Sequence, residues 1–121
     1  MSAPLLGLAR PNHYRFKLGG FEIIQLHDGA LHMAGPQPPF AIDQSKETAQ
    51  ALCAANHLPG DKLENSYTCT MINTGKELVL FDTGNGSAKQ SGGQGFLLKA
   101  MAAAGYTPDQ VDLVVTTHCH P

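Results

Sequence analysis

Residues 111–121 decide the fold, and they read Val-Asp-Leu-Val-Val-Thr-Thr-His-Cys-His-Pro. A run of aliphatic residues leads into His118 and His120, which are one residue apart. Alternate side chains of an extended chain point to the same face, so both imidazoles are expected to reach one point, with Cys119 turned away as a packing residue. Two imidazoles are half of a tetrahedral zinc site. We therefore predict a buried strand over 111–117 that ends in two metal ligands; the alternative is that these histidines merely terminate the strand.

The strands upstream are predicted as two hairpins. Apolar residues alternate over 14–18, and a Gly-Gly pair separates them from a second strand over 21–26, which is a β-hairpin signal. Asp28-Gly29 is expected to close that second strand. A further strand over 66–73 turns through Thr74-Gly75-Lys76 into a core strand over 78–81. This second hairpin delivers Asp82 to a strand end, where its carboxylate can accept backbone N–H bonds and hold a neighbouring loop.

Two helices and one helical turn are predicted. Ser45 can cap a helix over 46–56. A second helix over 96–104 ends at Gly105, and its apolar stripe is expected to lie on the sheet. That stripe consists of Leu97, Ala100, Met101 and Ala104. Residues 107–110, Thr-Pro-Asp-Gln, have the pattern of a capping box for a single turn.

The remaining segments are predicted as connections in a single domain over 1–121. Residues 1–12 are expected to form an irregular arm, because Pro4 and Pro11 discourage regular pairing. Residues 30–65 are either a lid over a site or a plain connection. Residues 85–95 are rich in glycine and are read as a connection that borders a pocket. His27 is expected at a pocket edge, and His32 and His57 at the solvent-exposed surface.

These motifs carry a resemblance to a known family. The sequence Thr-His-Cys-His-Pro over 117–121, after an aliphatic strand, resembles the opening of the Thr-His-x-His-x-Asp-His motif of the metallo-β-lactamase superfamily. The segment 77–84, Glu-Leu-Val-Leu-Phe-Asp-Thr-Gly, resembles the strand and turn that precede this motif. The front of the chain, residues 14–29, resembles the branch that contains methyl parathion hydrolase and related lactonase-like enzymes. The Asp and His that follow in the family motif are absent after Pro121.

The resemblance implies an α+β fold, namely the amino-terminal half of a four-layer αβ/βα sandwich with a mixed sheet and flanking helices. It implies a zinc-dependent hydrolase that acts on an ester, lactone or phosphoester through a metal-bound hydroxide, with two zinc ions in a complete family member. His118 and His120 would be metal ligands, and Asp82 would orient them without touching the metal. No residue is assigned a catalytic role. We expect the 121-residue chain by itself to show no appreciable hydrolase activity and to be prone to association, for which a homodimer is one form.

Composition excludes several classes of partner. The net charge of −2 with 15% charged residues provides no basic cluster for nucleic acid. No apolar run reaches the ~18 residues of a membrane helix, and the amino terminus does not have the pattern of a secretory signal. Three cysteines are few and odd in number for a disulfide framework, so a reducing, cytoplasmic compartment is expected. The expected partner is a small-molecule substrate.

Two alternative functions remain open at this point. Asp82-Thr83-Gly84 also resembles the catalytic loop of retroviral-type aspartic proteases, in which one Asp from each subunit of a homodimer shares a proton. Against this reading, Asn85 stands where those proteases have Ala or Ser, and His118 and His120 stay unexplained. The second alternative is a non-catalytic fragment that keeps the fold without the function.

Overall fold

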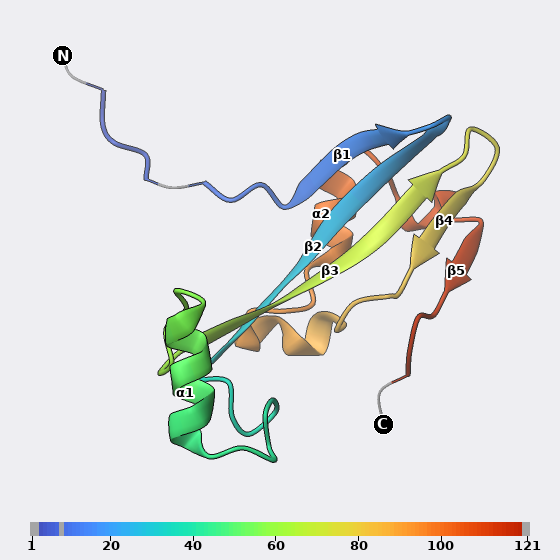
Figure 1. Ribbon diagram of the computed structural model, residues 1–121. Helices are drawn as coiled ribbons and strands as arrows, with labels where there is room; N and C mark the ends of the chain where they lie inside the picture. The colour runs from blue at the N-terminus through green and yellow to red at the C-terminus, as the bar shows by residue number, and fades with distance from the viewer. Residues whose placement is uncertain (1–2, 8, 120–121) are drawn as a thin grey trace.

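A computed structural model describes residues 3–7 and 9–119, and five strands in it form one sheet (Figure 1). The strand order is β1-β2-β3-β4-β5; the first four strands pair antiparallel and β5 pairs parallel to β4. The elements are β1 (His13–Leu18), β2 (Phe21–Met33), α1 (Lys46–Ala55), β3 (Leu63–Asn73), β4 (Leu78–Phe81), η1 (Ser87–Gly92), α2 (Leu97–Ala103), η2 (Pro108–Gln110) and β5 (Leu113–Val115). The described residues before His13 form no helix or strand.

Local turn and cap signals form as the sequence predicts. Gly19 adopts a φ of 59°, a conformation that glycine reaches without steric cost, and this closes the β1–β2 hairpin. The hydroxyl of Ser45 accepts a hydrogen bond from the backbone N–H of Thr48 at 3.1 Å and so caps α1. Thr107 and Gln110 form the predicted capping box of η2. The predicted β1–β2 hairpin and the predicted starts of α1 and η2 are therefore confirmed.

The predicted end of the second strand at Asp28-Gly29 is wrong. β2 continues to Met33 and pairs with β3 from Glu22 to Met33, with a register shift between His27 and Gly29. A β-bulge accommodates one extra residue without ending the ladder, and here the extra residue is Asp28. The long β2–β3 pair extends away from the other strands and carries α1 at its far end (Figure 1). The segment predicted as a connection over 30–65 is therefore shorter, because β2 ends at Met33 and β3 begins at Leu63. Whether this segment acts as a lid stays a prediction.

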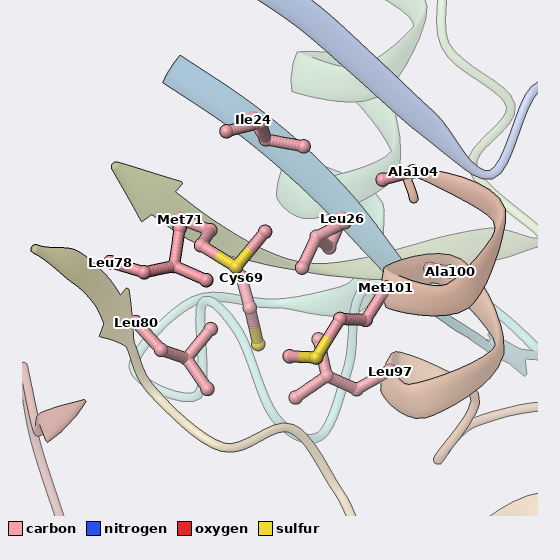
Figure 2. Close-up of a cluster of buried hydrophobic side chains, with 10 residues drawn as sticks. All are labelled: Ile24, Leu26, Cys69, Met71, Leu78, Leu80, Leu97, Ala100, Met101 and Ala104. Atoms are coloured by element: carbon pink, nitrogen blue, oxygen red, sulfur yellow. The ribbon is translucent and has the colours of Figure 1, made fainter. Parts of the chain in front are cut away.

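The hydrophobic core lies between the sheet and α2 (Figure 2). The predicted stripe of α2 is buried, and its side chains pack against one face of the central strands. The sheet contributes Ile24, Leu26, Cys69, Met71, Leu78 and Leu80, and the helix contributes Leu97, Ala100, Met101 and Ala104. The predicted position of this helix on the sheet is confirmed.

The last strand differs from its prediction. β5 comprises only Leu113–Val115, and Leu113 and Val114 are 52% and 47% exposed. The aliphatic run predicts burial, but β5 lies at the edge of the sheet and has a strand neighbour on one side only. Cys119 is exposed as well, so its predicted packing role is wrong.

The second face of the sheet carries apolar side chains away from α2. Directly paired residues of neighbouring strands share a face, and Tyr14↔Gln25, Phe16↔Ile23 and Leu18↔Phe21 are such pairs. We define the open face by its exposed apolar side chains, which are Tyr14, Phe16, Leu18, Phe21 and Leu113. None of the helices in residues 3–7 and 9–119 is long and apolar enough to cross a membrane.

Candidate metal centre

The parallel pairing of β4 and β5 brings the carboxyl ends of both strands to one edge of the sheet. Asp82 directly follows β4, and Thr117 and His118 follow β5 after one intervening residue. The backbone N–H of Asp82 donates to the carbonyl oxygen of Val115 at 2.9 Å. The two segments that the sequence singled out for a site therefore lie side by side.

Asp82 turns the chain sharply at this edge. Its φ of 63° is in the left-handed region, which Asp tolerates better than most residues because its short side chain can bond locally. The carboxylate accepts two hydrogen bonds from Thr117. The backbone N–H of Thr117 donates to Oδ1 at 2.8 Å, and its hydroxyl donates to Oδ2 at 2.5 Å. Asp82 thus holds the segment that carries the first predicted ligand.

Thr117 also contacts His118, and sequence reasoning assigned it no role. The hydroxyl oxygen of Thr117 lies 2.9 Å from Nδ1 of His118. In metal-binding histidines, one ring nitrogen commonly makes such a hydrogen bond, which fixes the ring, while the other nitrogen coordinates. The signal was present in the sequence, because Thr117 immediately precedes the histidine motif.

The described residues supply one member of the predicted ligand pair. His118 is exposed at the edge of the sheet, and His120 lies outside the described residues. Within 3–7 and 9–119, no three His, Cys, Asp or Glu side chains are grouped so that they could hold a metal ion. An imidazole oriented by a hydroxyl and a carboxylate fits one position of a zinc site.

A second carboxylate, Asp28, organises the loops beside this edge and was missed by the sequence analysis. It is fully buried. Its Oδ2 accepts from the backbone N–H and side-chain amide of Asn85, both at 2.8 Å, and from the N–H of Gly95 at 3.2 Å. Its Oδ1 accepts from the N–H of Leu97 at 2.8 Å. Asp28 therefore ties the loop after Asp82 and the start of α2 to the bulge of β2.

Crowding by Asp28 explains why the last residue of the Asp-Thr-Gly turn, Gly84, has no side chain. Gly84 has a φ of +70°, and a Cβ at this position would lie 2.6 Å from Oδ1 of Asp28. A side chain would therefore meet both backbone strain and a direct clash. The sequence around the carboxylate, His27-Asp28-Gly29, has the pattern of a turn and gives no signal of its burial.

Cys69 packs beneath this region. Burial raises the pKa of the Cys69 thiol to about 11, with further contributions from the negative charges of Asp28 and Asp82, while a backbone hydrogen bond at Gly84 acts in the opposite direction. Thiolate is the form that binds metals and acts as a nucleophile. Cys69 is therefore a neutral core residue.

A cavity of about 470 Å³ borders the loop before α2. Gly93, Arg10, His27, His32 and Glu64 contribute to its lining. His27 thus lies at a pocket edge and Gly93 at the pocket border, as the sequence predicts. His32 and His57 are both exposed, also as predicted.

Part of this chain is similar to a known protein family. Residues 64–121 match the family model described as the metallo-beta-lactamase superfamily. The likeness to this superfamily covers just under half of the chain. The matched residues include β3 except its first residue, β4, β5, Asp82, Thr117 and His118. The candidate metal centre therefore lies within the matched part.

Two solved structures are similar to this chain. One is AidC, a dizinc quorum-quenching lactonase in complex with a product, N-hexnoyl-L-homoserine, with a TM-score of 0.78 and 24% identity over 91% of this chain and 37% of AidC. The other is the hydrolase AbOPH in the beta lactamase superfamily, with a TM-score of 0.79 and 28% identity over 94% of this chain and 38% of AbOPH. This chain thus spans less than two fifths of the length of either structure. A search of curated proteins finds no match.

These findings give the aspartic protease alternative no support. The sheet has the mixed topology of part of a metallo-beta-lactamase sandwich, and both similar structures share it. The carboxylate of Asp82 accepts hydrogen bonds from Thr117 of the same chain, and these bonds hold two segments of one chain together.

Proposed function

We propose that this chain contributes to a zinc-dependent hydrolase of an ester, lactone or phosphoester, with His118 and His120 as metal ligands. The observation that carries the proposal is the bonded series Asp82, Thr117 and His118 at the ends of two parallel strands. This series lies inside the part that matches the metallo-beta-lactamase superfamily. The dizinc lactonase AidC and the hydrolase AbOPH, which share the fold, support the choice of metal and of reaction class.

The residues of this chain would hold the metal and orient its ligands rather than react with the substrate. His118 and His120 would each donate a nitrogen lone pair to the metal, and Asp82 would keep the strand end that carries them in place through Thr117. When bound, zinc would activate water and polarise the scissile carbonyl or phosphoryl group. Catalytic zinc sites have three protein ligands, and His118 and His120 would be two of them.

Zinc binding to the 121-residue chain tests the ligand assignment. Isothermal titration calorimetry should show zinc binding that His118→Ala weakens by about 100-fold or more, since loss of a ligand should cost at least as much as loss of a residue that orients one. His57→Ala is the matched control, because His57 is exposed and follows α1, in a different part of the chain. Equal zinc affinity of the wild-type and His118→Ala chains would reject the assignment.

Hydrolysis is tested on protein expressed from the complete native gene. A lactone, an aryl ester and a phosphotriester are offered in the presence of zinc, and His118→Ala should abolish turnover of the accepted substrate. The 121-residue chain should leave all three intact. Turnover by this chain that is lost in His118→Ala would contradict the expectation of inactivity.

A further inference from the structure

We infer that Thr117 is a positioning residue that holds the imidazole of His118 in the Nδ1–H tautomer, with the unprotonated nitrogen at Nε2. The part of this inference that concerns zinc rests on the proposed function. The tautomer itself follows from the hydrogen bonds of residues 82, 117 and 118, and it can be measured without any metal.

The number of available protons determines the direction of each hydrogen bond. An ionised carboxylate, the usual form of Asp near neutral pH, can only accept. Oδ2 of Asp82 and the hydroxyl oxygen of Thr117 are 2.5 Å apart, and the proton between them is therefore the hydroxyl proton of Thr117. A threonine hydroxyl has one proton, so it has none left for His118.

The contact between Thr117 and His118 must then run in the other direction. Nδ1 of His118 lies 2.9 Å from the hydroxyl oxygen, which can accept through its lone pairs. Nδ1 therefore carries a hydrogen and donates it. In a neutral imidazole with Nδ1–H, the lone pair available for coordination is on Nε2.

Substitutions of Thr117 can separate the role of its hydroxyl from that of its backbone N–H. Its backbone N–H bonds Oδ1 of Asp82, and this contact holds the strand end whatever the side chain is. Thr117→Val keeps the side-chain shape and that backbone bond but removes the hydroxyl. Thr117→Ser keeps the hydroxyl. Thr116→Val is the control, because the Thr116 hydroxyl makes no hydrogen bond to any residue that the structure describes.

Nitrogen NMR of the metal-free chain tests the tautomer. Histidine nitrogens labelled with ¹⁵N are recorded at about pH 8.5, roughly two units above the ordinary histidine pKa, and His118 is assigned from the signal absent in His118→Ala. The wild type, Thr117→Ser and Thr116→Val should show Nδ1–H at His118, whereas Thr117→Val should show a mixture of tautomers. A predominant Nε2–H form in the wild type, or the same tautomer in Thr117→Val, would overturn the inference.

Zinc titration of these four proteins and of His118→Ala separates this inference from the proposed function. Thr117→Val should bind zinc about 10-fold or more weakly than the wild type, and Thr117→Ser and Thr116→Val should bind close to wild type. Nδ1–H in the wild type together with zinc affinity that His118→Ala leaves unchanged would refute the proposed function and uphold the tautomer. Zinc affinity lost in His118→Ala but unchanged in Thr117→Val would reject the positioning role alone.

Discussion

At the scale of single residues, Cys69 couples stability to pH. Its thiol is buried in the core, and its pKa of about 11 lies above the ordinary value of 9.0. In the unfolded chain the thiol loses its proton near pH 9, whereas in the folded chain it keeps the proton until about pH 11. The folded state binds more protons in this interval, so the stabilising contribution is complete below pH 9 and is lost as the pH rises toward 11.

We therefore expect the free energy of unfolding to fall more steeply between pH 9 and 11 in the wild type than in Cys69→Ala. Urea unfolding at several pH values measures both slopes. Cys53→Ala is the control, since Cys53 is only half-buried and lies on α1. A slope in Cys69→Ala that matches the wild type would show that the thiol does not titrate across this interval.

At the scale of elements, the loop after β4 depends on the bulge of β2. Asp28 in the bulge binds Asn85, and Gly84 passes so close to this carboxylate that no side chain fits. The loop begins at Asp82, which holds the segment of His118. The bulge thus supports the candidate metal centre through one short loop.

Replacing Gly84 by alanine should be more destabilising than the same change at Gly75. Both glycines have positive φ, +70° and +83°, so both variants lose about 1–2 kcal/mol to backbone strain. Only Gly84→Ala adds a clash, with its Cβ 2.6 Å from Oδ1 of Asp28, for about 1–3 kcal/mol more. Urea unfolding of both variants measures the difference. Equal destabilisation would mean that the loop moves away from Asp28 at little cost.

At the scale of the whole molecule, the open face makes self-association the expected behaviour of the 121-residue chain. α2 covers one face of the sheet, while the open face presents Tyr14, Phe16, Leu18, Phe21 and Leu113. Contiguous exposed apolar surface of this kind favours association. The short edge strand β5, with partly exposed Leu113 and Val114, adds unpaired backbone groups.

Phe16→Lys should shift the chain toward monomer, because it places a charge in the open face. Light scattering over a range of protein concentrations measures the mean mass. Leu52→Lys is the control, since Leu52 is 56% exposed but lies on α1, away from this face. A wild-type chain that is monomeric at every concentration would contradict the prediction.

The sequence by itself determined the features whose causes are local. The Gly19-Gly20 turn, the Ser45 cap and the apolar stripe of α2 each depend on residues within a few positions of one another, and each formed as predicted. The aliphatic strand before Asp82 and the histidine motif indicated the family for the same reason, since their identities and spacing are read directly from the chain.

Tertiary structure decided the features that join distant residues. Asp28 is read locally as a turn residue, yet its carboxylate binds Asn85, which is 57 positions away. Asp82 and Thr117 meet across 35 positions because β4 and β5 pair in parallel. The aliphatic run of β5 predicts burial, but the order of the strands places it at an edge. Sequence periodicity reports which side chains share a face, whereas partners and exposure depend on what the folded chain brings against that face.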